Sequence, residues 1–410
     1  MSDIELLFLV LAIIYAFECT CWIRRGSVGL RTWMWRRWTL AHPSSLLGNQ
    51  RGGTVFAHPF PPLGNLLIAS QSPVSLSPNA VLAFFASSVN PNGRGPQTGG
   101  FFELDQVRRV DVRGKRVLVN GEPLVKAPST VFAQHLTQQL RHICELAADK
   151  REKAIRQMVK ESFDTKAVEA RWLDFQQRSR SLQVLTNVLF AYLFLAAPVV
   201  IWRWGFSDAW LWLVLGLLAC TLPTAMLFQR AHRHFFPLEE DERFTGFLLV
   251  LLSPATAVRA HDLLSRQLLE TFHPLAVVKV FCTQNLLAQF ARTVLRELHY
   301  PALPLCPRSE PTAQRTEQFW RSLVRTEVES CLNRWHLKPA ELLLPPLPTD
   351  STCLSYCPRC QAQFTSASGE CADCGGLPLL PFSSKSVATE ALARPEKPES
   401  NCPRVSDAYE

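Results

Sequence analysis

Several well-known catalytic signatures are absent from this sequence of 410 residues. It contains no phosphate-binding G-x-x-x-x-G-K-[ST] loop, no H-E-x-x-H motif and no G-x-S-x-G nucleophile elbow. The glycine-rich stretch Asn92–Gly100 lacks the strand-then-helix setting that a nucleotide-binding loop needs. The sequence therefore predicts no catalytic residue, and it favours a protein that is not an enzyme.

Acidic residues are missing from the centres of three long apolar runs, Ile4–Trp22, Val184–Trp202 and Trp210–Phe228. Proton- or ion-coupled transport paths need ionisable groups inside the membrane, so the absence of acidic residues from these runs argues against a coupled transporter. A helix over Ile4–Trp22 would be about 28 Å long, close to the thickness of a bilayer core. Only Arg203–Ala209 separates the other two runs, which predicts an antiparallel hairpin. The sequence therefore predicts three transmembrane helices and a lipid bilayer as a partner.

The first apolar run has no Lys or Arg before it and no small-residue cleavage site after it, so a signal peptide fits poorly. Basic residues instead follow this run and flank the hairpin. Because cytoplasmic flanks of membrane helices are rich in Lys and Arg, the pattern predicts an outside N-terminus. The bulk of the chain and its C-terminus are then cytoplasmic, and we expect a multi-pass protein of a bacterial-type cytoplasmic membrane.

A fourth apolar run, 247–258, is too short to cross a bilayer comfortably. Ser253 followed by Pro254 is typical of a helix N-cap and first turn. We therefore expect an interfacial or re-entrant segment that turns into a helix. A fourth crossing stays open as an alternative.

The region between the first run and the hairpin is rich in strand signals. Alternating valines over Val107–Val119 are interrupted by the turn pairs Arg113-Gly114 and Asn120-Gly121. Ser129 or Thr130 can cap the helix that follows. Several strands closed by one C-terminal helix resemble a pleckstrin-homology-like small barrel. After the hairpin, amphipathic helices are expected at 254–271, 274–299 and 313–335.

The thirteen cysteines are an odd number in a long chain without a predicted secretion signal, which makes a disulfide framework improbable. Four of them form two C-x-x-C pairs, Cys357-Pro-Arg-Cys360 and Cys371-Ala-Asp-Cys374. This stretch resembles a zinc ribbon, and the resemblance implies a structural zinc ion held by all four thiolates. A module of this size cannot bury a hydrophobic core. Metal binding would therefore supply most of its folding free energy. A redox dithiol is the competing interpretation.

Two other groups form a weaker candidate polar site: His232 and His234, followed by acidic residues, and Arg259, His261 and Asp262. A solvated loop and a helix-surface ion pair of Asp262 with Arg266 are the simpler interpretations. Convergence of both groups at the membrane surface would instead indicate a binding site.

Together these patterns predict an α+β integral membrane protein. In chain order we expect a transmembrane helix at 1–23, a cytoplasmic strand-rich domain with a C-terminal helix at 24–150, a charged helix at 151–183, the transmembrane hairpin at 184–228, a cytoplasmic or membrane-surface helical region at 229–338, a proline-rich linker at 339–352, the zinc ribbon at 353–380 and a disordered tail at 381–410.

The leading functional hypothesis is a membrane-anchored interaction or assembly protein that binds another protein. The first alternative is a subunit of a membrane enzyme with a polar site at the cytoplasmic bilayer surface. The second is nucleic-acid binding through the ribbon. It is disfavoured because basic residues near the ribbon are few and are opposed by Glu370 and Asp373; they are Arg359 within it and Lys385 and Arg394 in the tail. The sequence leaves a small-molecule substrate unknown.

Overall fold

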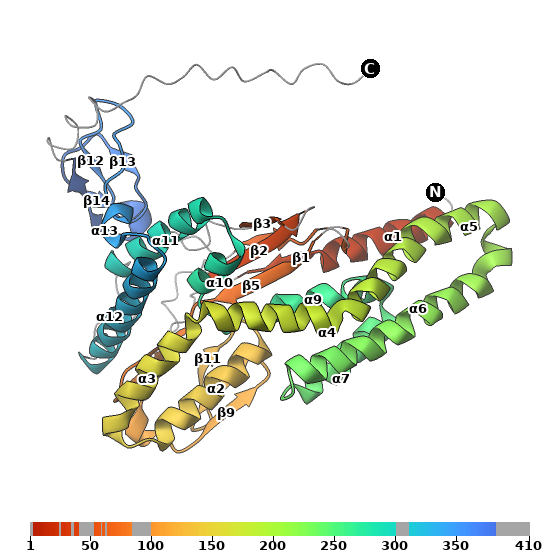
Figure 1. The fold of residues 1–410 in the computed structure, drawn as a ribbon, viewed down its shortest axis with the longest axis horizontal. Helices are drawn as coiled ribbons and strands as arrows, with labels where there is room; N and C mark the ends of the chain where they lie inside the picture. Colours follow the sequence, from red (N-terminus) through yellow and green to blue (C-terminus); the bar gives the residue numbers. More distant parts are fainter. Residues whose placement is uncertain are drawn as a thin grey trace.

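The computed structural model describes residues 3–23, 26–33, 37–40, 53–58, 60–61, 64–83, 100–300 and 311–382. Nearly all of the loop predicted at 89–100, and the predicted tail from 383 onward, lie outside these residues. The described chain is a mixture of long helices and several small sheets (Figure 1). A helical hairpin extends to one side, the sheets lie in the middle, and a cysteine-containing module lies at the opposite end.

Two helices are long and apolar enough to cross a membrane. The first runs without interruption from Thr165 to Trp204 and comprises α4 (Thr165–Ala191), the π-helical turn η5 (Tyr192–Ala196) and α5 (Ala197–Trp204). The second is α6 (Phe206–Phe235). Only 22% of the most apolar window of each helix is buried. Such extensive uncovered apolar surface is expected where lipid is the solvent.

The two arms of the hairpin meet at Gly205 and lie close together along their length. Gly205 has φ 75° and ψ 160°, a conformation that is essentially restricted to glycine. Further along, Tyr192 Oη donates a hydrogen bond to the Leu213 carbonyl at 2.5 Å. A Cβ on Gly216 would lie 2.8 Å from Tyr192 Oη, so this approach needs a glycine on α6.

The first apolar run folds as a shorter helix than the sequence predicts. Helix α1 (Asp3–Glu18) ends before Trp22 and is about 24 Å long. Residues Thr20–Trp22 instead form β1, which pairs antiparallel with β4 (Thr54–Phe56). The β-branched and aromatic side chains of β1 suit a strand better than a helix end. The predicted helix boundary is therefore wrong, and the predicted third crossing is not confirmed.

Helix α1 lies beside the hairpin. The ring centroid of Tyr15 is 6.2 Å from that of Phe190 and 5.1 Å from that of Phe194. In Figure 1 the N-terminal end of α1 lies near α5, while its C-terminal end points toward β1. Helix α1 therefore runs antiparallel to the first arm of the hairpin.

The short apolar run after the hairpin turns back along α6. Helix α7 (Glu240–Leu252) packs antiparallel on α6 (Figure 1), and a Cβ on Gly246 would lie 2.9 Å from the Phe228 ring. Ser253 ends α7, and its hydroxyl accepts a hydrogen bond from Thr256 N at 3.3 Å to cap α8 (Pro254–Val258). The cap predicted at Ser253-Pro254 is present.

The described strands that precede α2 form small antiparallel sheets. Their orders are β1-β4, β3-β2-β5, β6-β7-β8 and β11-β10-β9. Gly114, Asn120 and Gly121 have positive φ at the two tight turns of the last sheet, as the turn pairs predict. Hydrogen bonding among the described strands does not join these sheets into one closed barrel, so the pleckstrin-homology-like fold is not confirmed. The remaining bounds are β2 (Ser27–Trp33), β3 (Arg37–Leu40), β5 (Leu66–Ser70), β6 (Val74–Leu76), β7 (Ala80–Ala83), β8 (Phe101–Glu103), η4 (Leu104–Gln106), β9 (Val110–Arg113), β10 (Arg116–Val119) and β11 (Glu122–Lys126).

Several predicted helices are divided in the structure. The helix expected at 254–271 breaks at Arg259, and the one expected at 274–299 breaks at Cys282, whose backbone is extended. A one-turn helix, α13 (Pro339–Leu342), interrupts the predicted linker. The bounds are α2 (Thr130–Glu145), α3 (Ala148–Ser162), α9 (Ala260–Leu268), α10 (Pro274–Phe281), α11 (Gln284–His299) and α12 (Pro311–Arg334).

Candidate metal centre and polar clusters

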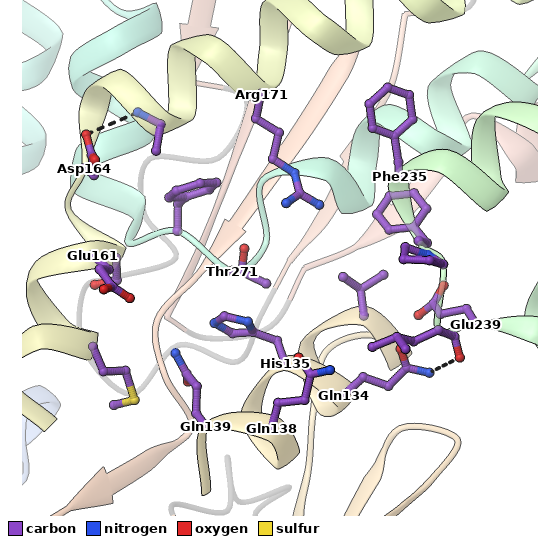
Figure 2. Close-up of a pocket in the computed structure, with 18 residues that line it drawn as sticks. Gln134, His135, Gln138, Gln139, Glu161, Asp164, Arg171, Phe235, Glu239 and Thr271 are labelled. Carbon is purple, nitrogen blue, oxygen red and sulfur yellow. Dashed lines mark hydrogen bonds between the residues drawn. The ribbon is translucent and has the colours of Figure 1, made fainter. Parts of the chain in front are cut away.

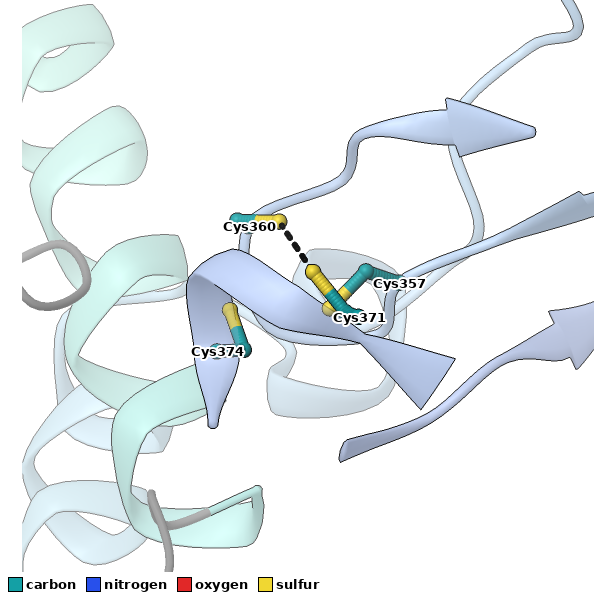
Figure 3. A group of neighbouring side chains, drawn as sticks. All are labelled: Cys357, Cys360, Cys371 and Cys374. Carbon is teal, nitrogen blue, oxygen red and sulfur yellow. Dashed lines mark hydrogen bonds between the residues drawn. The ribbon is translucent and has the colours of Figure 1, made fainter. Parts of the chain in front are cut away.

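The four cysteines of the two C-x-x-C pairs come together in one cluster. The four sulfur atoms all lie within 4.8 Å of one another; they belong to Cys357, Cys360, Cys371 and Cys374. Figure 3 shows the four side chains converging, with 3.7 Å between the sulfurs of Cys360 and Cys371. These distances are short enough for one metal ion to bind all four thiolates.

Short strands hold the cluster in a small module, here called the cysteine module (residues 353–382). The strands are β12 (Ser355–Tyr356), β13 (Gln363–Phe364), β14 (Glu370–Cys371), β15 (Leu377–Pro378) and β16 (Leu380–Pro381), arranged as β13-β12-β16 and β14-β15. Three of the four cysteines, all except Cys360, are almost completely buried. The cysteines are thus the core of a module that has little other apolar material.

The turn after each cysteine pair adopts a left-handed backbone conformation. Gln361 has φ 66° and donates its amide hydrogen to the Cys357 carbonyl at 2.9 Å. Gly375 has φ 74° at the equivalent point, just after the one-turn helix η6 (Ala372–Cys374). At Gln361 the first turn therefore places a non-glycine residue in a left-handed conformation that glycine adopts more readily, at a small cost in backbone strain.

Backbone hydrogen bonds already favour a thiolate in the first turn. Burial raises the pKa of the Cys357 thiol, but hydrogen bonds from the backbone amides of Cys360 and Arg359 outweigh burial and hold that pKa below its usual value. Burial raises the pKa of Cys360 to about 11. A bound cation would reverse this second shift, since metal binding releases the proton of a ligating thiol.

The cysteine module docks on α11 through a buried arginine. Arg359 lies between the first two cysteines, is only 3% exposed, and places Nη2 at 3.3 Å from Glu297 Oε1. Its Nε and Nη1 atoms are buried without a hydrogen-bond partner. Arg359 therefore faces the helical part of the protein rather than solvent.

Arg259, His261 and Asp262 belong to a buried group of hydrogen-bonded side chains next to β5, here called the node. Asp262 is ion-paired with Arg259, lies 3.6 Å from Arg266 Nη2, and accepts a hydrogen bond from Leu66 N at 2.8 Å. Arg259, which has no exposed surface, donates to the His58 carbonyl at 2.7 Å. The two charges offset each other and bind backbone groups of the strand region, so the node fastens α9 to β5.

His261 extends this node toward α4. Its Nε2 lies 3.0 Å from Ser179 Oγ, and burial lowers its pKa to about 4, so the ring is neutral near pH 7. A neutral, hydrogen-bonded imidazole in an apolar setting is consistent with a packing role.

The two histidines of the weaker candidate site do not join this node. His232 is buried with Nε2 at 3.5 Å from Glu239 Oε2, whereas His234 is exposed and its Nε2 lies 3.3 Å from Asp174 Oδ2. Among the described residues, no hydrogen bond or ion pair connects either histidine to Arg259, His261 or Asp262. The candidate site thus divides into three separate local contacts.

A pocket that sequence reasoning missed lies between α2, α3, α4 and the loops that follow α6 and α9 (Figure 2). Its volume is about 400 Å³, and its polar lining includes His135, Glu161, Arg171, Glu239 and Thr271. These residues come from five separate stretches of the chain. No spacing in the sequence could have linked them.

Comparisons with known proteins identify no relative. No family model matches the chain, no curated protein matches it, and no solved structure matches it. The geometry of its sites is therefore the basis for assigning a function.

Proposed function

We propose that the protein is a membrane-anchored interaction or assembly protein in which a zinc-stabilised cysteine module is presented to a protein partner. The observation that carries this proposal is the closed cluster of four thiols, docked on α11 through Arg359. Four thiolates complete the tetrahedral shell of a zinc ion and leave no position for water or substrate. Such a centre would hold the cysteine module in a fixed shape, so that its surface can bind a partner, and would not take part in a reaction.

The donor set favours zinc over other metals. Sulfur ligands in a tetrahedral arrangement suit zinc or an iron centre, whereas magnesium and calcium prefer oxygen ligands. Two C-x-x-C turns around one ion are also the usual ligand set of structural zinc. The cysteine module would then depend on the ion for its fold.

The helical hairpin and α1 support a three-helix membrane anchor. The turn around Gly205 is bordered by the exposed indoles of Trp202, Trp204, Trp210 and Trp212, a pattern typical of a membrane interface. Helix α1 lies antiparallel to the first arm, and its Tyr15 ring packs near the rings of Phe190 and Phe194 in that arm. With basic residues at the other end, the N-terminus and the Gly205 turn would be outside and the cysteine module cytoplasmic.

The orientation can be tested by labelling intact cells with a membrane-impermeant maleimide. A cysteine introduced by Ser207→Cys, in the exposed turn, should react, whereas one introduced by Lys153→Cys, exposed on α3, should react only after the cells are opened. The opposite pattern would invert the proposed topology.

The interaction role can be tested by affinity capture from detergent extracts, with metal content measured on the same samples. The unchanged protein should contain one zinc ion per chain and retain a specific partner, and Cys357→Ser should lose both. The matched control is Cys353→Ser, because Cys353 belongs to the same module but lies outside the cluster. A partner that is retained equally by all three proteins would contradict a role for the module.

No specific observation favours the two alternatives that the sequence left open. An enzyme site formed by Arg259, His261, Asp262 and the two histidines would require these side chains to converge, and they do not. Nucleic-acid binding would require accessible cations on the module, and Arg359 is buried against α11.

A further inference from the structure

The pocket at the base of the hairpin contains a cation that lacks a counterion. Arg171 projects from α4 into the pocket, where Figure 2 shows it pointing toward His135 on α2. Within the part of the chain that the structure describes, no carboxylate lies within salt-bridge distance of its guanidinium, and its Nε is buried without a hydrogen-bond partner. Leaving a partly desolvated cation unpaired costs free energy, which a bound anion would recover.

The acidic residues on the same part of α4 and in the pocket lining are engaged elsewhere. Asp164 caps α4 by accepting hydrogen bonds from Lys166 N at 2.9 Å and Ala167 N at 3.2 Å. Asp174, one helical turn away on α4, pairs with Arg178 at 2.6 Å and with His234 at 3.3 Å. Glu161 is exposed at the rim and accepts a hydrogen bond from Gln157 at 2.9 Å. Arg171 therefore remains available to a ligand.

The other side chains around the pocket suit an amphipathic molecule. Burial and the neighbouring Arg171 lower the pKa of His135, so its neutral ring can donate or accept a hydrogen bond. Thr271 and Gln139 add polar groups, while Phe272 and Met158 provide apolar surface. A cavity of about 400 Å³ falls in the size range of small-molecule sites.

A second polar group, at the far side of the pocket, has unsatisfied hydrogen-bonding capacity. Glu239 is 2% exposed; its Oε2 lies 3.5 Å from His232 Nε2, but neither carboxylate oxygen makes a hydrogen bond. Burial, reinforced by the nearby Glu242 and Glu270, raises its pKa to about 8. At neutral pH this carboxyl is mostly protonated and can donate a hydrogen bond, so it does not repel an anion bound at Arg171.

The position of the pocket relative to the bilayer follows from the proposed crossing. Arg171 precedes Val184, the first residue of the apolar run, by 13 residues, which is about 20 Å along the helix. The headgroup layer extends only about 5–8 Å beyond the hydrocarbon core on each side. A ligand dissolved in the aqueous phase can therefore reach the pocket more readily than a lipid headgroup.

We propose that this pocket binds a small, soluble organic anion, with one carboxylate or phosphate group held by Arg171 and an apolar body packed against Phe272 and Met158. This site is independent of the cysteine module, so it can be present whether or not the proposed assembly function is correct.

The test is fluorine NMR of 4-fluorobenzoate, 4-fluorophenyl phosphate and uncharged 4-fluorobenzyl alcohol with the full-length protein in phosphatidylcholine nanodiscs. One or both anions should bind saturably and the alcohol should not. Arg171→Gln should weaken anion binding at least tenfold. Lys166→Gln, which removes an exposed cation on the same helix outside the pocket, should leave the affinity within twofold.

A second variant makes the test independent of Arg171. Ala167→Phe fills the pocket while keeping the arginine, and it should also abolish saturable binding. The site is disproved if neither anion binds saturably to the unchanged protein, if the alcohol binds as well as the anions, or if Arg171→Gln binds them normally. Repeating the titration in nanodiscs with phosphatidylglycerol should give the same affinity. A threefold or larger loss that persists at high salt, where repulsion of the ligand by the charged bilayer is screened, would assign the pocket to an anionic lipid headgroup instead of a soluble ligand.

Discussion

At the scale of single residues, the buried charges of this protein fall into two kinds. Arg259 and Asp262 are almost fully buried but satisfy each other and the backbone of the strand region. Arg171 and Glu239 line a cavity and have hydrogen-bonding capacity left over. Arg259 Nε also lacks a hydrogen-bond partner, so what separates Arg259 from Arg171 is its ion pair with a carboxylate and not complete hydrogen bonding.

The first prediction concerns the paired kind. Asp262→Asn keeps the shape of the side chain but leaves Arg259 uncompensated, so we expect the free energy of unfolding to fall by about 3–5 kcal/mol. Glu341→Gln is the matched control, because its pair with Lys338 is exposed to solvent and should contribute little to stability. Chemical denaturation in mild detergent measures both variants. Equal stabilities would show that the node does not fasten α9 to β5.

The second prediction concerns pH. The pKa of Glu239 is about 8 in the folded protein and near 4.5 in the unfolded chain. Between these values the Glu239 carboxyl binds more protons in the folded state than in the unfolded state, so its own contribution to stability falls as pH rises from about 4.5 to 8, by a few kcal/mol. Glu239→Gln, which mimics the protonated carboxyl, should raise the melting temperature at pH 8 and change it little at pH 4.5. A variant with the same pH dependence as the unchanged protein would exclude Glu239 as its source.

At the scale of elements, local signals were reliable where one short stretch decides the structure. The turns at Gly114 and Asn120-Gly121 and the caps at Ser129 and Ser253 need only their neighbours, and all are present. The end of α1 could not be predicted, because Thr20–Trp22 becomes a strand only through pairing with Thr54–Phe56. The break at Arg259 likewise depends on partners far away in the chain, such as His58 and Leu66.

The same distinction applies to the candidate sites. The four cysteines could be found because two C-x-x-C pairs carry their own geometry. The pocket could not, because Arg171, His135 and Glu239 have no shared spacing.

The third prediction tests the turn of the hairpin. A Cβ at Gly205 would meet no atom within 4 Å, so Gly205→Ala introduces backbone strain without a steric clash. We expect a loss of about 1–3 kcal/mol in unfolding free energy. Ser207→Ala in the same turn should be nearly neutral, and thermal unfolding in bicelles distinguishes the two. If Gly205→Ala unfolded like the unchanged protein, the turn would have another conformation available.

At the scale of the whole molecule, the cysteine module and the hairpin lie at opposite ends and are stabilised by different means (Figure 1). The hairpin depends on helix packing and on apolar surface suited to lipid. The module has a core made mainly of its cysteines, with Leu379 and a few partly buried neighbours. The two ends should therefore lose structure independently.

The fourth prediction follows from this separation. Removing the metal with a strong chelator should expose the cysteine module, residues 353–382, to limited proteolysis while the fragment that contains α4 and α6 stays intact, because a small metal-dependent module unfolds without its ion. Mass spectrometry of the fragments measures the outcome, and zinc added before the protease should restore protection. Protection that persists after complete metal removal would show that the module folds without metal.

The uninterrupted helix from Thr165 to Trp204 has a mechanical consequence. Arg171 and Trp204 are separated by 33 residues of this helix, so a tilt of about 5° pivoting at Arg171 would displace the tryptophan by about 4 Å. Because the helix is this long, a small change in its tilt at Arg171 would move Trp204 by a distance that paired spin labels can resolve.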